Sequence, residues 1–574
     1  MKRLYLFSAV SILFAIAPGF VLADITDSYQ GTVYYVSDAR GSDSNDGLGW
    51  TTAKKTIDGA LGQIGVDLVS SAQIWVSAET PNDVGTTDSY AAPTSTVGDG
   101  VSLFGGFDGT ETYRWQRSWR EHVTTIQGQT SIRSSALDGF TVMSPSGTGV
   151  VAASGYGLIS HNIIKSVSVG IRCGECASPV IENNLIIGFS TTAIWAQYGM
   201  PYLVANNTIV HKGDNTGTTG VKLSESYSLG CDVGISLRAN IIAGCAVGVD
   251  DPGDLVVSQV QANNDFYQDT VVGISGWQQI TDPPGFVDPD NDDYRLSSNS
   301  PCIDVDGGNG YLEQLDLDGN PRFVDIPSVR EDGVCAYDIG AYEYQAPPLV
   351  DRGLPTTNIN SAAGANRANI RWADSDPSVF HGDTFVLPAG DWTIDRIRVW
   401  AIPSVPGYPY YNLGDHFSNI ALYTGYASGN LGGACSTDLV PGSSNCINSR
   451  VQITPVVYAD GNGYERPGGG FDRVWQIDFK ELSLNVTGGQ SYGFAVYGTP
   501  KIDRLWFSAA SNAAASGWSG GAGDDSISAL DVSSLITLGV TIDFTDPLAA
   551  WLGRDAAGSV RGSDINVQVF AHRQ

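Results

Sequence analysis

An asparagine that recurs at nearly regular intervals is the feature that most constrains how this chain can fold. It accompanies short apolar runs at five points, Asn162, Asn184, Asn207, Asn240 and Asn264. The intervals between them are 22, 23, 33 and 24 residues. An internal period of this length is typical of stacked repeats. A β-propeller is the other repeat architecture to consider, but its blades need about 40 residues, so the period is too short for it.

A second motif keeps the same period. It runs Gly170-Ile171-Arg172, Ala193-Ile194-Trp195, Gly220-Val221-Lys222, Gly248-Val249-Asp250 and Gly273-Ile274-Ser275. An apolar β-branched residue always follows the small one, and a different kind of residue comes next, which is the inward and outward alternation of a strand. Each repeat is therefore predicted to be one coil of a parallel β-helix with stacked asparagines. The long third interval predicts a loop insertion at 224–231, and Gly139 is expected to hold the asparagine position one coil earlier.

Composition excludes several classes of function. The 574 residues include 31 Lys and Arg against 61 Asp and Glu, a formal net charge of -30. Most of the surface therefore repels a polyanion, and nucleic acid is excluded as a partner. Hydrophobic residues make up 42% of the chain, which excludes a disordered acidic protein. The 69 glycines indicate many turns and hence many short strands.

The N-terminus has the pattern of a secretory signal peptide. Lys2 and Arg3 precede an apolar run that ends near the small residue Ala23, as cleavable signals do. We expect residues 1–23 to be removed and the mature chain to be secreted, either extracellular or at the cell surface. The alternative is a retained membrane anchor. No later apolar run is long enough to span a bilayer, so the mature chain is expected to have no membrane span.

The chain has eight cysteines, an even number that fits an oxidising compartment. Spacing favours Cys435 with Cys446 first, then Cys302 with Cys335, then Cys231 with Cys245, and it leaves the connectivity open. The pair Cys173 and Cys176 has CxxC spacing, but a zinc site needs a second such pair or nearby histidines, and the sequence supplies neither.

Motifs at both ends of the repeat region carry a resemblance. They are YYVS at 34–37, GSDSNDG at 41–47, Trp50, AKKTI at 53–57, LFGGFDGTE at 103–111, the segment 115–119, DLDGNPR at 316–322 and DIGAYEY at 338–344. Together they resemble the secreted bacterial right-handed parallel β-helix proteins of the pectate-lyase-like class, over roughly residues 30–345. The resemblance implies a right-handed parallel β-helix with an N-terminal cap over residues 24–345. The cap is expected to include a helix around 52–64. The class includes lyases, hydrolases and surface proteins, so the resemblance indicates fold more than activity.

Residues 346–350 are predicted to be a linker, and residues 351–574 a β-sandwich of jelly-roll type. The asparagine period stops there and strand-like alternation takes over between glycine-rich turns, at 392–400, 474–479, 492–496 and 565–570. Trp392 and Trp400 are eight residues apart, so alternation places them on one face. Core filling is favoured for these tryptophans over sugar stacking. Trp518 lies in a Gly/Ser-rich loop and is the best candidate for an exposed, substrate-binding ring.

The strand motif aligns four outward residues in one column, Arg172, Trp195, Lys222 and Asp250. Coils stack about 4.8 Å apart, so the column spans on the order of 14 Å. Its two cations could pair with uronate carboxylates, and its indole could stack on the face of a pyranose ring. Asp250 could accept hydrogen bonds from sugar hydroxyls. A neighbouring outward column holds Glu182, Ala205 and Arg238, and Arg238 is a further substrate-binding candidate. The alternative is that these columns are ordinary solvated sheet faces.

Two functions follow, and the sequence leaves both open. One is a polysaccharide lyase that acts on an acidic extracellular glycan, which needs a cation and a base; Arg172, Lys222 and His211 are the catalytic candidates. The other is a non-catalytic surface, adhesive or matrix-binding protein. A hydrolase needs two separated carboxyl groups, whereas the aspartates at 250, 251 and 254 share a Pro-Gly turn, so hydrolysis is less favoured. In either case an extracellular polysaccharide or cell-surface glycan is the expected partner.

Two aspartate-rich loops suggest calcium, because hard oxygen ligands at short spacing suit that ion. The candidate ligands are Asp43 and Asn45 in the first loop and Asp288, Asp290 and Asp292 in the second. Neither loop has the complete EF-hand pattern, and the same residue types also form turns.

Overall fold

The computed structural model places most of the region 31–352 and separate parts of the chain beyond it. It describes residues 31–67, 71–78, 88–111, 114, 117–120, 122–199, 201–223, 235–251, 259–260, 264–267, 270–272, 280–306, 315–320, 322, 324, 337–352, 354, 370–373, 379–403, 417–426, 434–437, 450–456, 464–465, 471–472, 474–480, 482, 484–500, 506–508, 528–531 and 566–573. The predicted signal peptide at 1–23 and Trp518 lie outside these residues. Among the described helices, none has the length and hydropathy needed to cross a bilayer.

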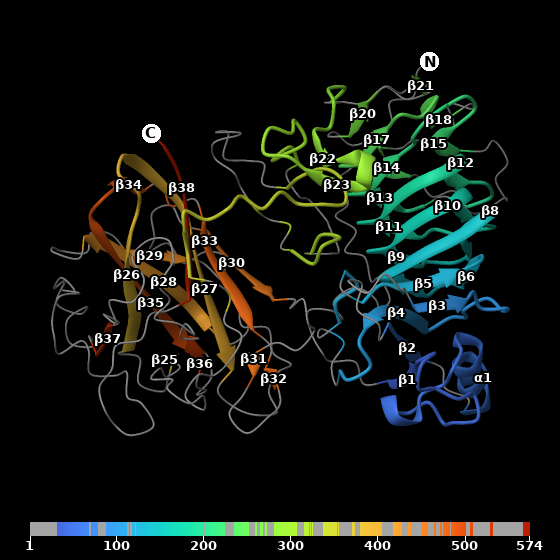
Figure 1. Ribbon diagram of the computed structural model, residues 1–574, viewed down its shortest axis with the longest axis horizontal. Helices are drawn as coiled ribbons and strands as arrows, with labels where there is room; N and C mark the ends of the chain where they lie inside the picture. Colours follow the sequence, from blue (N-terminus) through green and yellow to red (C-terminus); the bar gives the residue numbers. More distant parts are fainter. Residues whose placement is uncertain are drawn as a thin grey trace, which may run out of the picture.

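Parallel strands stack along residues 32–272 in the order in which they occur in the sequence (Figure 1). We call the first sheet the first side. Its strands are β1 (Thr32–Val36), β2 (Ala72–Ser77), β4 (Val101–Phe107), β7 (Ala136–Asp138), β9 (Leu158–Ser160), β11 (Val180–Glu182), β13 (Leu203–Ala205), β16 (Ser236–Arg238) and β19 (Gln259–Val260). Because spatial order follows sequence order, each turn of the chain lies on the preceding one.

The second sheet supplies the two other sides of each coil. Its strands are β3 (Asp88–Ala91), β5 (Thr124–Gln127), β6 (Thr130–Arg133), β8 (Phe140–Ser154), β10 (Ile163–Cys173), β12 (Leu185–Ala196), β14 (Thr208–Val210), β15 (Thr219–Leu223), β17 (Ile241–Ala243), β18 (Val247–Asp250), β20 (Asp265–Tyr267) and β21 (Thr270–Val272). The long strands β10 and β12 change register between Val167 and Val169. Their first halves form the second side with β14, and their second halves form the third side with β15. The predicted right-handed parallel β-helix is confirmed.

A ladder of asparagine side chains joins the coils at the corner between the first and second sides. Each Asn Nδ2 donates to the Oδ1 of the next asparagine at 3.0 or 3.1 Å, from Asn162 through Asn184, Asn207 and Asn240 to Asn264. All five side chains are fully buried. The same amides bond backbone groups at the corner, for example Asn184 Nδ2 to the Ile159 carbonyl at 2.8 Å. The ladder therefore satisfies polar backbone that the stack would otherwise bury unpaired.

The expected role of Gly139 is wrong by one residue. Thr141 pairs with Ile163, which places Phe140 opposite Asn162 and Gly139 opposite His161. Gly139 instead occupies the left-handed position that precedes the asparagine in later coils, where φ is 79° for Gly139 and 52° for His161. Glycine adopts such a φ without steric cost, which accounts for it at this corner.

The N-terminal end carries the expected helical cap. The 3₁₀ turn η1 (Trp50–Thr52) leads to α1 (Ile57–Asp67), which Figure 1 shows beside β1 and β2 at the end of the stack. Ile57, Ala60 and Ile64 are buried and extend the core of the coils over the open end. The helix predicted at 52–64 is confirmed with a shift of its boundaries.

The described parts of residues 280–344, which we call the covering segment, pack on the outside of the coils. It begins with a hairpin made of β22 (Phe286–Asp288), the 3₁₀ turn η4 (Pro289–Asn291) and β23 (Asp293–Leu296). Tyr294, Ile303 and Ile339 of this segment share a hydrophobic cluster with outward residues of the second side such as Ile187 and Val210. The outer face of the second side is therefore a buried interface.

The described strands beyond residue 348 form two larger antiparallel sheets around one core, and a separate two-stranded pair. One sheet contains β24 (Val350–Asp351), β25 (Ile370–Ala373), β27 (Asp391–Pro403), β30 (Arg450–Pro455), β33 (Trp475–Lys480), β34 (Leu484–Thr487), β36 (Trp506–Ser508) and β38 (Val567–Arg573). The other contains β26 (Val379–Val386), β28 (Phe417–Tyr426), β29 (Ala434–Thr437), β35 (Ser491–Pro500) and β37 (Ser528–Asp531), and β31 (Tyr464–Glu465) pairs with β32 (Phe471–Asp472). Ile397 and Phe479 of the first sheet meet Phe494 of the second in the same buried cluster. The predicted β-sandwich is confirmed, and Val350, placed in the linker, already belongs to its first strand.

One detail of the sandwich prediction fails. The register of β27 shifts between Ile394 and Arg396, so Trp392 joins the core with Ile394 and Ile397, while Trp400 alternates onto the opposite face. Trp400 is nevertheless 2% exposed.

Two of the three predicted disulfides are wrong. Cys302 and Cys245 are buried and neither forms a disulfide, which rules out their pairing with Cys335 and Cys231. Cys302 instead contacts Asp265, with Sγ 3.3 Å from Oδ2. The side chains of Cys435 and Cys446 lie outside the described residues.

Candidate functional site

The predicted outward column exists on the third side of the β-helix. Arg172 pairs with Trp195, Trp195 with Lys222, and Lys222 with Asp250, each as direct neighbours in adjacent parallel strands. Beyond Asp250 the partner is Val272, so the motif at 273–275 is not the next member of the column. We call the four residues the third-side column.

Burial confirms which way these strands face. The preceding residues Ile171, Ile194, Val221 and Val249 are at most 1% exposed and line the interior of the coils. The four column residues are partly exposed, as alternation predicts. Arg172 is positioned by a hydrogen bond from Nη1 to Gln197 Oε1 at 3.0 Å. Two cations and an indole therefore share one accessible strip, with a carboxylate at its end.

Arg238 does not belong to an accessible surface. Register places it in one column of the first side with Glu182 and Ala205, as expected. All three are buried, and Arg238 is only 6% exposed. Burial lowers the pKa of the Arg238 guanidinium, while the charges of Asp306 and Glu182 oppose that shift. Its burial does not favour Arg238 as a substrate-binding residue, because alternation gives a side chain's direction and not what covers it.

The same column contains a charged cluster that the sequence reasoning missed. Asp138 accepts from Arg117 Nη2 at 2.6 Å and lies 3.0 Å from His161 Nδ1, with all three side chains buried. Desolvation alone raises the pKa of Asp138, but Arg117 and His161 together hold it well below its usual range. His161 Nε2 also contacts the Leu315 carbonyl of the covering segment at 3.3 Å. The cluster anchors that segment, and its members are too far apart in the sequence to be recognised as a group.

Further carboxyl groups are buried within the covering segment itself. Burial raises the pKa of Asp316 to about 6 and raises those of Asp338 and Glu343 well above their usual values. Their oxygens accept backbone N–H groups, such as Glu343 to Asp316 at 2.9 Å. Arg322 donates to Asn183 Oδ1 at 2.7 Å and so ties this network to the corner of the coils. The network therefore has a role in fixing the cover.

His211 lies at the corner after β14, and both of its ring nitrogens contact backbone carbonyls. Nδ1 is 3.1 Å from the Phe189 oxygen and Nε2 is 3.0 Å from the Asp214 oxygen. A general base needs a free lone pair on one nitrogen. Carbonyl oxygens occupy both positions, so this geometry does not favour His211 as a base.

The first calcium candidate loop uses its polar groups to build the cap. Asp43 Oδ1 accepts from the backbone of Lys55 and Thr56 at 3.0 and 2.9 Å, and Oδ2 accepts from the Thr56 hydroxyl at 2.9 Å. These bonds satisfy donors just before α1. Asn45 Nδ2 donates to the Ala53 carbonyl at 3.0 Å.

The second loop is the tip of the covering hairpin. Asp288 Oδ2 accepts from Asn291 at 2.7 Å, and Asp292 pairs with Lys212 at 2.8 Å. The Lys212 ammonium also lies 3.4 Å from the Asp290 carbonyl. Among the described residues, no group of three or more His, Cys, Asp or Glu side chains is arranged to hold a metal ion.

Two exposed tyrosines beside the column were also missed. Tyr156 is 70% exposed and Tyr198 is 43% exposed, and both lie in turns that leave the third side. A usable signal was present, since each tyrosine is next to glycine, in Gly155-Tyr156-Gly157 and Tyr198-Gly199. An aromatic side chain within a tight turn has little core to enter.

Comparison with known proteins supplies no family. No protein-family model matches the chain, and a search of curated proteins finds no match. Among solved structures, the enzymatically active domain of tailspike protein 2 of bacteriophage CBA120 is similar at 10% identity, covering 86% of this chain and 84% of that one, with a TM-score of 0.20. A similarity this weak carries no argument. The fold rests on strand order and register, and the pectate-lyase-like class remains a prediction from sequence motifs.

Proposed function

We propose that this chain is a secreted protein that binds an acidic extracellular polysaccharide along the third-side column. The observation that carries the proposal is the direct register of Arg172, Trp195 and Lys222 on adjacent strands, together with their partial exposure. A guanidinium and an ammonium attract sugar carboxylates, and an indole between them offers a stacking face.

Local charge supports an acidic ligand despite the net charge of -30. Within the part of the chain that the structure describes, Lys222 has no hydrogen-bond or ion-pair partner, although Asp250 is its strand neighbour. An unpaired cation on a strip spaced by about 4.8 Å per coil suits repeated carboxylates. Low salt should strengthen this attraction, because exposed charges are screened by ions.

Lyase activity is the finer proposal. Lys222, in its uncharged form, would take the proton next to a uronate carboxylate whose charge Arg172 helps to neutralise. The carbon–oxygen bond to the leaving sugar would break to leave a carbon–carbon double bond, and the resulting Lys222 ammonium would return the proton to the leaving oxygen. Calcium is proposed as a possible aid, through Asp250 and the bound carboxylates. The other candidate is a non-catalytic adhesive or matrix-binding protein, which would use the same column without turnover.

Binding and cleavage can be tested together. The full chain is mixed with alginate, polygalacturonate and a neutral glucan, with and without calcium, while binding and the ultraviolet absorbance of unsaturated products are recorded. We expect binding to the acidic polymers, stronger at low salt. A rise in ultraviolet absorbance that Lys222→Ala abolishes would support the lyase. Binding without a rise in absorbance would support the adhesive role. Equal or absent binding to all three polymers would contradict the proposed function.

A further inference from the structure

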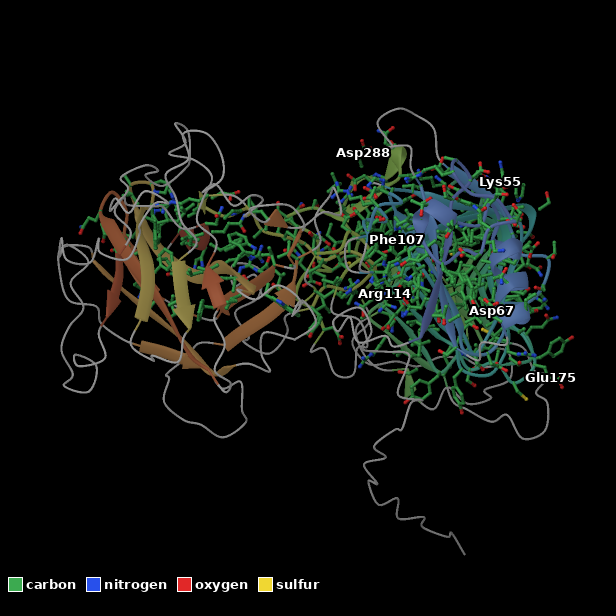
Figure 2. All side chains as sticks on the ribbon, turned by 90° about the horizontal axis from the view of Figure 1, so that it is seen from below. Lys55, Asp67, Phe107, Arg114, Glu175 and Asp288 are labelled. Atoms are coloured by element: carbon green, nitrogen blue, oxygen red, sulfur yellow. The ribbon has the colours of Figure 1, made fainter. Side chains whose placement is uncertain are left out.

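The turns at the edge of the third side form a rim that presents Tyr156 and Tyr198 to solvent. We define the rim as residues 155–157, 174–178 and 197–199, which follow β8, β10 and β12. Tyr156 and Tyr198 lie two coils apart, a separation on the order of 10 Å along the stack. Figure 2 shows Glu175 of the intervening turn at one edge of the β-helix domain, with Asp288 of the covering hairpin at the opposite edge.

Backbone contacts lock the successive turns onto one another. Gly155 donates to the Cys176 carbonyl at 3.1 Å, Ser178 donates back to the Gly155 carbonyl at 2.8 Å, and Tyr198 donates to the Cys173 carbonyl at 3.3 Å. A Cβ placed on Gly199 would lie 2.2 Å from the Gly174 oxygen, so the turns are packed too closely for a larger residue. The two rings are therefore exposed side chains on a rigid backbone.

A rigidly presented tyrosine suits ligand binding, because it offers a large amphipathic face with few torsions to restrict. The rim also continues directly from the third-side column. Trp195 lies near the end of β12, and Tyr198 follows three residues later in the turn. Gln197, between them, accepts the hydrogen bond from Arg172. An isolated exposed aromatic residue needs no explanation, but these two lie in turns at the same edge of the third side.

We propose that Tyr156 and Tyr198 form a second, aromatic subsite of the same glycan site, on which pyranose rings stack as the polysaccharide leaves the third-side column. This inference rests on the proposed function. The described rim presents aromatic rings and the acidic Glu175, whereas the cations lie in the column. The rim should therefore recognise sugar faces rather than carboxylates, and the column should supply the preference for acidic chains.

The test compares two oligosaccharides that differ only in charge, a polygalacturonate oligomer and its carboxyl-reduced neutral form. Affinities are measured by calorimetry at low and high salt for Tyr156→Ala, Tyr198→Ala, the double variant and Tyr198→Phe. Val66→Ala is the matched control, because Val66 is 75% exposed on α1 at the capped end.

We expect each tyrosine-to-alanine change to weaken binding roughly three- to ten-fold, by the same factor for both oligomers and at both salt concentrations. Tyr198→Phe and Val66→Ala should bind like the wild type. A double variant with wild-type affinity, while Trp195→Ala binds weakly, would overturn the rim subsite and leave the proposed function intact. A loss confined to the acidic oligomer at low salt would also overturn it. Failure of the wild type to bind either oligomer would overturn both proposals.

Discussion

The first and third sides of the β-helix are built from the same coils and have opposite outer surfaces. On the first side the outward residues Glu182 and Arg238 are buried, and the charge of Asp306 in the covering segment acts on Arg238. On the third side Arg172 and Lys222 remain partly exposed. On both sides the strands of successive coils pair in parallel, with equivalent residues as direct neighbours. The difference shows that a repeat determines the direction of a side chain, while distant segments determine whether it reaches solvent.

The largest loss of stability should come from breaking the corner that joins the first side to the second. Asn184 Nδ2 donates to the Glu182 carbonyl and to Asn207 Oδ1, and Asn184 Oδ1 accepts from Asn162. Asn184→Ala would leave several buried groups unpaired, each costing about 1 to 3 kcal/mol. We expect the free energy of unfolding to fall by about 4 kcal/mol or more in a denaturant titration. Ser190→Ala, at an exposed position of the same strand, should change it little, and equal effects would show that the ladder is not stabilising.

The next largest effect should come from the interior of the third side. Ile194 is fully buried within the coils, so Ile194→Ala should lower the free energy of unfolding by ~2 to 5 kcal/mol through the cavity that it leaves. Thermal and chemical denaturation would measure this loss. If Ile194→Ala were neutral and Trp195→Ala unfolded the chain, the inward and outward assignment would be wrong by one residue.

The buried carboxyl groups of the covered sides should also make the free energy of unfolding depend on pH more than the open third side does. Burial raises the pKa of Asp265 in β20 to about 7, and a hydrogen bond from the Cys302 thiol of the covering segment opposes the shift. A carboxyl pKa that is higher in the folded chain stabilises it at pH values below the unfolded pKa, and this contribution is lost as pH rises through about 7.

Asp265→Asn tests this expectation because it removes the titrating group. The decline in the free energy of unfolding between about pH 5 and pH 8 should be smaller in the variant than in the wild type, as measured by denaturant titrations at both pH values. An unchanged decline would show that Asp265 does not titrate in this range.

The sequence was enough to predict the coils, their period and the identity of the third-side column, because those depend on local repetition. It could not predict the burial of Arg238, which depends on a segment far along the chain. Trp400 was assigned to the wrong face because a register shift at Ile394 is invisible in a simple alternation. Asp43 was read as a metal ligand, although the same oxygens equally suit the donors that precede a helix.

The candidate site likewise has a part that the sequence could predict and a part that it could not. Strand periodicity was sufficient to place Arg172, Trp195 and Lys222 together. It could not show that both nitrogens of His211 face carbonyl oxygens, because that depends on how neighbouring turns fold. The exposed tyrosines of the rim were missed for a related reason, since they lie in turns, outside the repeated strand motif.

The central claim is that the third-side column is an accessible glycan site and not part of the packing. The most direct test is the affinity of Trp195→Ala for a polygalacturonate oligomer, measured together with its melting temperature. We predict that binding weakens by ~1 kcal/mol, about five-fold, through lost stacking, while the melting temperature stays close to that of the wild type. A variant that melts far earlier, or one that melts normally and binds with unchanged affinity, would contradict the account.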